Sequence, residues 1–234
     1  MSFHRLGIFP GARLLDLGCG FGRHSWQAYH YPGVRIVAAD INPLLLNANR
    51  FMLSGMEVQN IRGGEYAHVV CADARDLPFP DASFDIAVCS EVLEHIPDDR
   101  RAASELYRVL APGGRLGVSV PNRFPESVCW KLYKDYPEMA DGHIRIYSAE
   151  GLCRLFTDAG FTPYGTGRAH ALDTPYWWLN CLAARVSVFR AAAVRYKSFL
   201  DSHVIRPTAA TRLLEHLGRP FLAKSRVLYL KKQD

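Results

Sequence analysis

Five short apolar runs alternate with longer segments in the first half of the chain, and each run has the length of a buried strand. The runs are residues 13–17, 34–40, 68–72, 84–90 and 115–120. Two helix starts are marked between them, by Asn42 ahead of Pro43 and by Asp98 ahead of a helix that ends before Pro112. Apolar strands that alternate with helices are typical of a parallel sheet covered on both faces. The pattern therefore predicts an α/β, doubly wound fold.

A glycine-rich turn follows the first predicted strand. Asp16 lies at the strand end, and Gly18, Gly20 and Gly22 alternate after it. Glycine lets the backbone approach a ligand where any side chain would clash. The second predicted strand ends at Asp40, about 20 residues beyond the loop, which is the distance at which a βαβ unit brings a carboxylate to ribose hydroxyls. Both signals predict a nucleoside pocket.

The ends of the third and fourth predicted strands carry further polar groups. Asp73 follows the third strand with Ala74, and a carboxylate there can accept a hydrogen bond from an exocyclic amine such as adenine N6. Ser90 ends the fourth strand and is expected beside the reacting part of a cofactor.

In this order the residues resemble the class I S-adenosylmethionine-dependent methyltransferases, especially the branch that acts on small molecules and quinones. The resemblance is carried by residues 16–22, Asp40, Asp73 with Ala74, 90–96 and 110–116, and it covers about residues 13–121; 143–148 and 151–161 also resemble that branch. It implies S-adenosylmethionine as cofactor. The residues it implies for binding are Asp16, Gly18, Gly20, Gly22, Asp40, Ile41, Asp73, Ala74 and Ser90.

The resemblance also implies an architecture. It predicts a Rossmann-like, seven-stranded sheet in a single methyltransferase domain over residues 1–234, with a sixth strand at 161–171 and an antiparallel final strand at 225–231. Residues 122–147 form a substrate loop insertion, and 172–223 form a helical lid or dimer insertion. Family members usually carry helices ahead of the first strand, whereas a dozen residues precede Arg13. Either the lid is rebuilt from the two insertions or the true N-terminus is longer.

Two histidines are candidates for acid–base chemistry. A sulfonium methyl is already activated, so positioning and exclusion of water supply much of the rate. A hydroxyl acceptor also needs a general base, and histidine is best tuned for this near neutral pH. We favour His143 over His95, which can instead orient its neighbours. Arg145 and Tyr147 are predicted to bind substrate, and Arg145 can equally anchor its loop. O-methylation of a small, lipophilic metabolite is favoured, with C- or N-methylation as alternatives.

The late segment is basic and aromatic. Trp177 and Trp178 begin an apolar run that can cover a substrate, form a dimer contact or lie at a membrane surface. Arg185, Arg190 and Arg195 are spaced by five, which would spread them around a helix rather than along one polar face. This spacing favours a lid or homodimer contact over a membrane contact.

Composition narrows the remaining choices. The chain has 234 residues, 49% of them hydrophobic, which suffices for a core without metals or disulfides. Its net charge of +5 is mild, and no nucleic-acid motif appears, so we expect no nucleic acid partner. The six cysteines lack the paired spacing of a zinc site, and no metal ligands are predicted. Unpaired cysteines, with no signal peptide and no stretch long enough to span a bilayer, favour a cytoplasmic protein.

Two other functions fit the same βαβ unit. One is a nicotinamide-dependent oxidoreductase, which is disfavoured because the loop reads Gly-x-Gly-x-Gly rather than Gly-x-Gly-x-x-Gly. The other is a non-catalytic module that binds S-adenosylmethionine without turnover. The loop glycines and the strand-end carboxylates predict cofactor binding, but they do not distinguish a binding module from an enzyme.

Overall fold

The computed structural model describes residues 1–59, 63–135, 142–206 and 208–234. These residues form two compact units. The first unit comprises Met1–Ser119, Ala149–Gly165 and Leu228–Asp234, and the second comprises Val120–Ser148 and Thr166–Val227. The two predicted insertions fall in the second unit, and residues 136–141 of the earlier one lie outside the described residues. The single-domain boundaries stay a prediction.

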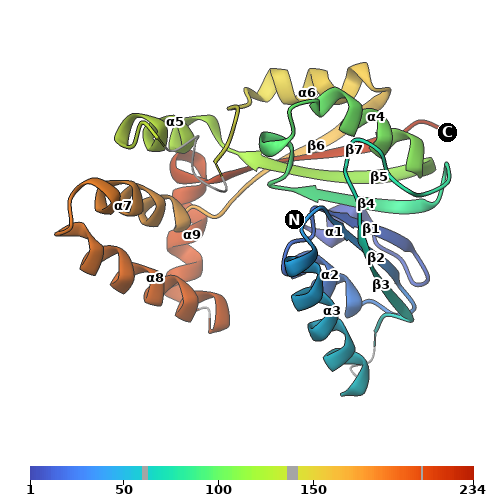
Figure 1. Ribbon diagram of the computed structural model, residues 1–234, viewed down its shortest axis with the longest axis horizontal. Coiled ribbons are helices and arrows are strands. Elements are labelled where there is room, and N and C mark those ends of the chain that lie inside the picture. The colour runs from blue at the N-terminus through green and yellow to red at the C-terminus, as the bar shows by residue number, and fades with distance from the viewer. Residues whose placement is uncertain (60–62, 136–141, 207) are drawn as a thin grey trace. The chain divides into compact units, whose positions relative to one another are not determined.

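A seven-stranded sheet has the strand order β3-β2-β1-β4-β5-β7-β6 (Figure 1). Neighbouring strands among the first five pair in parallel, and β7 lies between β5 and β6, running against β5 (Figure 1). The strands are β1 (Arg13–Leu17), β2 (Arg35–Asp40), β3 (Tyr66–Cys71), β4 (Phe84–Ser90), β5 (Leu110–Pro121), β6 (Phe161–Ala169) and β7 (Ser225–Lys232). The predicted fold class is therefore confirmed, including the final strand that inserts last.

The strand β5 is longer than the six residues predicted for it. It begins at Leu110, directly after the preceding helix, and it pairs with β4 across a register shift between Phe84 and Ile86. Gly113 has φ +73° and takes up the irregularity. Residues 112–114, which precede the strand predicted at 115–120, are thus part of β5.

Helices cover both faces of the sheet in the first unit (Figure 1). On one face lie α1 (Phe3–Leu6), α2 (Arg23–Tyr29) and α3 (Pro43–Val58), and on the other lie α4 (Asp99–Val109) and α6 (Ala149–Asp158). The start of α3 is capped as predicted, because Asn42 Oδ1 accepts a hydrogen bond of 3.0 Å from the Leu44 N–H. Asp98 caps α4 in the same way through the Arg101 N–H at 3.0 Å.

The core of the first unit is centred on β1 and its neighbours. Leu14, Leu15, Ile36, Ile86 and Leu116 are all at most 1% exposed. These strands are buried on both faces, which explains why their sequences are apolar throughout rather than alternating. A buried sheet with helices on both faces leaves the strand ends as the place for a ligand.

The second unit is largely helical. It contains α5 (Arg123–Leu132), α7 (Asp173–Arg185), α8 (Phe189–Ile205) and α9 (Ala209–Leu222). The prediction that Arg185, Arg190 and Arg195 share one helix is wrong, because the chain turns after Arg185 and the other two lie on α8. The turn is closed by hydrogen bonds from the Val186 and Phe189 N–H groups to the carbonyls of Leu182 and Val186.

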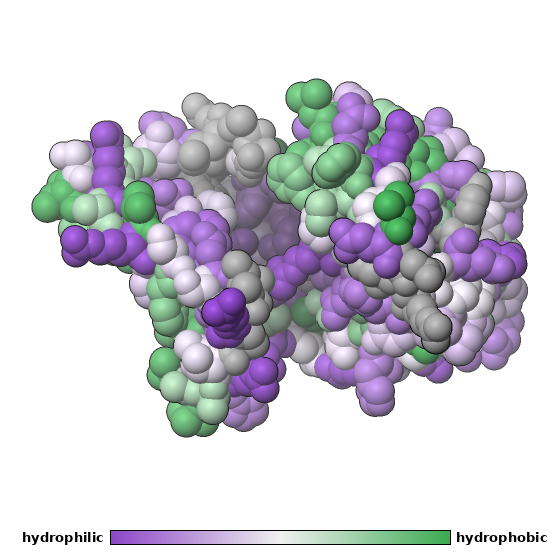
Figure 2. Space-filling model, turned by 90° about the horizontal axis from the view of Figure 1, so that it is seen from below, coloured by the Kyte–Doolittle hydropathy of each residue, from purple (hydrophilic) through white to green (hydrophobic). Residues whose placement is uncertain are grey.

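The aromatic pair of the late segment packs inside the second unit. Trp177 and Trp178 lie against the buried Cys129 and Cys181, and Trp178 Nε1 donates a 3.1 Å hydrogen bond to the Pro125 carbonyl. Apolar surface on the helical part of the molecule appears in patches broken by polar groups (Figure 2). The exposed apolar residues of α8 and α9 include Val194, Phe199, Leu213, Leu214 and Leu217. Within the described residues, no helix has the length and apolar character needed to cross a bilayer.

Candidate active site

Four neighbouring strands end at one edge of the sheet in the first unit. In spatial order they are β3, β2, β1 and β4, and all pair in parallel. Directly beyond or at their carboxyl ends lie Asp73, Asp40, the loop Gly18–Gly22 and Ser90. The chain continues from β1 to β2 and β3 on one side of β1, whereas β4 lies on its other side. The strand order therefore reverses beside β1, and sheets of this kind bind ligands at such a switch point. The sheet topology therefore brings the predicted nucleoside-binding residues together.

The three loop glycines are required for different reasons. Their φ angles are +67°, +52° and +92° at Gly18, Gly20 and Gly22. A Cβ on Gly18 would come within 2.1 Å of Val92 Cγ2, and one on Gly22 within 2.1 Å of Asn49 Oδ1. A Cβ on Gly20 would meet no protein atom within 4 Å. Packing explains Gly18 and Gly22, whereas Gly20 faces open space of the kind that a ligand occupies.

The carboxylate of Asp40 closes the loop onto β2. Its Oδ2 accepts a 2.8 Å hydrogen bond from the Gly20 N–H, and its Oδ1 accepts one of 2.8 Å from the Asn42 N–H. A carboxylate has about four lone-pair positions, so two accepted bonds leave capacity for ribose hydroxyls. Next to it, Ile41 is 66% exposed and offers an apolar surface to a planar base.

The carboxyl group of Asp16 is buried at the end of β1 and is hydrogen-bonded within the protein. It is 1% exposed, and its Oδ2 accepts hydrogen bonds from the Ser25 N–H at 2.8 Å and from Ser25 Oγ at 2.6 Å. Burial raises its pKa to about 6, against the lowering effect of the Ser25 hydrogen bonds. This carboxyl group ties the first turn of α2 to β1 and so fixes both sides of the glycine loop.

Asp73 already has a charged partner. Arg75 Nη2 lies 2.6 Å from Asp73 Oδ2, and the Arg75 N–H donates a 2.9 Å bond to Oδ1. The hydrogen bonds from Arg75 hold the Asp73 pKa below its ordinary value. Ala74 is buried beside it. An adenine amine that donates to Asp73 would therefore share this carboxylate with Arg75.

A chain of hydroxyl groups starts at Ser90. Its Oγ lies 2.7 Å from Ser119 Oγ, which donates a 2.9 Å bond to Glu91 Oε1. Glu91 has φ +56°, a left-handed conformation that costs roughly 1–2 kcal/mol for a side chain of this kind. Strain of this sort clusters at functional sites. Sequence reasoning did not select Glu91, because nothing in its residue type announces a positive φ.

Asn49 is a second residue that sequence reasoning missed. It is fully buried on α3, where its Nδ2 donates to Cys19 Sγ at 3.3 Å and its Oδ1 accepts from Trp26 Nε1 at 3.0 Å. The amide thus holds the glycine loop from behind. A signal was present, because Asn49 interrupts the apolar face that Leu46 and Leu53 form at helical spacing.

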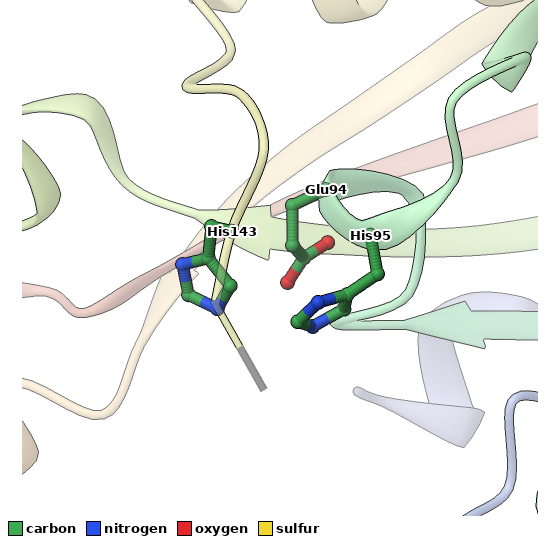
Figure 3. A group of neighbouring side chains, drawn as sticks. All are labelled: Glu94, His95 and His143. Carbon is green, nitrogen blue, oxygen red and sulfur yellow. The ribbon is translucent and has the colours of Figure 1, made fainter. Parts of the chain in front are cut away.

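The two candidate histidines belong to different units. His95 is exposed on the 3-10 turn η1 (Leu93–His95), next to the buried Glu94 (Figure 3). His143 is 8% exposed in the second unit, with its Nδ1 2.6 Å from Glu126 Oε1. Glu126 is itself buried and also accepts from Trp130 Nε1 at 3.0 Å. Glu126, which sequence reasoning did not select, fixes the orientation of the His143 ring.

The predicted substrate residues follow His143 in the second unit. Arg145 is half-buried and Tyr147 is 9% exposed, and residues 142–148 form no helix. Their roles toward a substrate stay predictions.

Residues 15–118 match the family model described as a methyltransferase domain. These residues form a methyltransferase domain. The predicted family resemblance is thereby confirmed for the part of the chain that carries the glycine loop and the four strand ends.

Curated relatives of this methyltransferase domain include proteins named as C-methyltransferases and as O-methyltransferases. A ubiquinone/menaquinone biosynthesis C-methyltransferase of Vibrio parahaemolyticus is 40% identical over 142 residues, covering 58% of this chain and 53% of the relative. An O-methyltransferase of Aspergillus sclerotiorum is 37% identical over 163 residues, covering 67% and 57%. The chain spans about half the length of the curated relatives it matches.

Similarity to solved structures confirms the fold over nearly the whole chain. A SAM-dependent methyltransferase of Methanosarcina mazei has a TM-score of 0.64 and 19% identity, covering 99% of this chain and 96% of that one. At this level of identity the likeness concerns the fold alone.

The residues of the methyltransferase domain fit S-adenosylmethionine, the cofactor that domains of this family use. Gly20 leaves room for a close approach, Asp40 has spare acceptor capacity beside it, and Ile41 is exposed next to both. Ribose hydroxyls need acceptors and a planar base needs an apolar surface, and here the two lie on consecutive residues.

We expect Gly20→Ala to abolish cofactor binding while leaving the domain folded. The new methyl meets no protein atom, so the folding cost is limited to the strained φ, roughly 1–2 kcal/mol. Gly55→Ala on α3 is the matched control, since a Cβ there also meets nothing and its backbone is helical. Urea unfolding and calorimetric titration of S-adenosylhomocysteine measure the two effects separately. Unchanged affinity in Gly20→Ala would show that the cofactor does not approach this face of the loop.

The buried Asp16 predicts a pH dependence of stability. Its folded pKa of about 6 lies above that of an unfolded carboxyl, so the folded protein holds a proton that the unfolded chain releases between about pH 4 and pH 6. The contribution of Asp16 to the free energy of unfolding therefore falls as pH rises through that window, by an amount on the order of 3 kcal/mol at most. Denaturation of the wild type and Asp16→Asn across pH 4–7 checks this, because other titrations cancel in the difference. A difference that stays constant over the window contradicts the raised pKa.

Proposed function

We propose that the protein transfers a methyl group from S-adenosylmethionine to a small, lipophilic acceptor by in-line displacement. The observation that carries the proposal is the open face of Gly20, hydrogen-bonded to Asp40 at the edge of the sheet, within residues that form a methyltransferase domain. When bound, S-adenosylmethionine supplies a methyl group on a positively charged sulfur, which keeps the electron pair of the broken bond. The protein then has to hold an acceptor in line and exclude water.

Oxygen is the acceptor atom that we propose, with ring carbon as the alternative. Relatives named for C-methylation and for O-methylation support one outcome each. The Glu126–His143 pair favours oxygen, because a hydroxyl acceptor has a proton to lose and this histidine has a buried carboxylate as partner. The hydroxyl proton passes to the imidazole as the new C–O bond forms, and the Glu126 carboxylate stabilises the resulting imidazolium.

His95 is the alternative base. It belongs to the same unit as the glycine loop and follows β4 directly on η1. Its exposure leaves it without the buried environment that orients His143, which is why we place it second. Arg145 and Tyr147 are proposed to contact the acceptor from the segment that carries His143.

The helices at 172–223 are proposed to cover the acceptor, with a homodimer contact as the alternative. Trp177 and Trp178 pack against Cys129 and Cys181 within their own unit, which supports a cover or a dimer contact over a membrane contact. The exposed apolar residues on α9 support a dimer contact as the alternative.

Binding of the cofactor is the first expected outcome. We expect S-adenosylmethionine and S-adenosylhomocysteine to bind in a calorimetric titration and NAD to give no heat. Asp40→Asn should weaken binding by about tenfold or more, since it replaces a charged acceptor at the ribose position. Asp158→Asn makes the same chemical change at an exposed position of α6 and should leave affinity unchanged. Failure of both sulfur nucleosides to bind the folded wild type would overturn the proposal and return the loop to another ligand or to a structural turn.

The base is tested with a short-chain alkyl catechol and a short-chain naphthoquinol as acceptors, with products identified by mass spectrometry. For an O-methylated product we expect His143→Gln to lower kcat by about a hundredfold or more. Glu126→Gln should lower kcat by a smaller factor, and His95→Gln should retain the wild-type kcat. A loss of kcat in His95→Gln but not in His143→Gln would reverse the assignment, and a C-methylated product would show that the acceptor atom is carbon.

A further inference from the structure

An open groove of about 680 Å³ lies in the second unit, and none of its lining residues has been assigned a role above. Its position is set by the start of α5, the end of α9 and the strands β6 and β7 where they belong to this unit. It is lined by Asn122, Arg123, Phe124, Ser127, Arg168, Pro220, Phe221 and Arg226. The volume lies in the range of pockets that bind small molecules.

The charge of the groove is one-sided. Three of its lining residues are arginines and none is a carboxylate. Among the residues that the structure describes, Arg123, Arg168 and Arg226 form no ion pair with an acidic side chain. Like charges that share a groove repel one another, and a bound negative charge relieves this repulsion.

The hydrogen bonds of the arginines leave most of their donors available. Arg168 Nη1 donates to the Pro220 carbonyl at 2.5 Å, and Arg226 Nη2 donates to Asn122 Oδ1 at 3.4 Å. A guanidinium has five N–H donors, so each of these two commits one. Both contacts hold the side chain in place against a neutral partner. Arg226 is half-buried.

The floor of the groove is fixed by Asn122. Its Nδ2 donates to the Ala223 carbonyl at 3.0 Å, and its own N–H donates to the Lys224 carbonyl at 2.6 Å. Because its Oδ1 serves Arg226, this side chain does not cap α5, although it stands at the N-cap position. The positive end of a ten-residue helix therefore adds to the charge of the arginines.

Apolar side chains stand beside these charges. Phe124 is 58% exposed and Phe221 is 74% exposed, and both line the groove. Arginine is the residue that best matches the planar, bidentate geometry of phosphate oxygens. Exposed phenylalanines next to it suit an apolar chain or ring on the same molecule.

We propose that this groove binds the phosphate group of an amphiphilic molecule, with the arginines Arg123, Arg168 and Arg226 holding the phosphate and Phe124 and Phe221 contacting the apolar part. The site lies in the second unit and does not depend on the proposed methyl transfer. The same chemistry is offered by a dissolved phosphorylated amphiphile and by the headgroup of an anionic lipid in a bilayer.

Arg123→Gln is the main test variant, because the Arg123 side chain forms no hydrogen bond with the residues that the structure describes. Arg226→Gln is the second variant, and Arg226→Lys keeps its charge without the forked geometry. Arg195→Gln on α8 removes the same charge at an exposed position outside the groove and is the matched control. S-adenosylhomocysteine affinity is measured on every variant and should stay unchanged, so that failure of this proposal is distinguishable from failure of the proposed function.

The first probe is inorganic phosphate against chloride at constant ionic strength, read as a shift in Tm. The second is dihexanoyl phosphatidic acid against dihexanoyl phosphatidylcholine, titrated below micelle concentration by calorimetry. We expect phosphate to raise Tm more than chloride does, and phosphatidic acid to bind. Affinity should fall about tenfold or more in Arg123→Gln and Arg226→Gln, partly recover in Arg226→Lys, and stay at the wild-type value in Arg195→Gln.

Vesicle pelleting distinguishes the two sources. Arg123-dependent pelleting with phosphatidylcholine vesicles that contain phosphatidic acid identifies a lipid headgroup, whereas binding of the short-chain lipid alone identifies a dissolved ligand. Either outcome supports the groove as a phosphate site. Equal responses to phosphate and chloride with no binding of phosphatidic acid, or equal losses in Arg195→Gln and Arg123→Gln, would overturn the proposal.

Discussion

The hydrogen bond from the Gly20 N–H to the Asp40 carboxylate joins the two features on which the candidate cofactor site depends. It fixes the glycine loop after β1 to the end of β2 at 2.8 Å, and the parallel pairing of these strands sets the two groups at the same level. Asp16 and Asn49 reinforce the loop from below, through Ser25 and Cys19. A site held in this way is formed before a ligand arrives, which lowers the ordering cost of binding.

Most of the sheet could be predicted because buried parallel strands read as apolar runs. β1 and β4 have the bounds that the sequence indicates, and the caps at Asn42 and Asp98 are where their residue types predict. The prediction was wrong for Arg185, Arg190 and Arg195, because a spacing of five was interpreted within one helix although the chain turns after Arg185. Periodicity cannot locate a break that contains neither glycine nor proline.

The candidate site was predictable in its glycines and strand-end acids but not in its supporting groups. Glu91 adopts a positive φ that no residue type announces, and Glu126 meets His143 only through the fold of the second unit. Asp16 shows a further limit. Its assignment to the cofactor stays a prediction, and the motif does not indicate that its buried side chain also joins Ser25 on α2 to the end of β1. A motif specifies which residues matter more readily than how each one acts.

The most direct test of the central claim is a crystal structure of the protein with S-adenosylhomocysteine. We expect ribose hydroxyls within hydrogen-bond distance of the Asp40 carboxylate, the Gly20 backbone against the ligand and the adenine ring on Ile41. A ligand bound elsewhere, with Asp40 contacting only the Gly20 and Asn42 N–H groups, would contradict it.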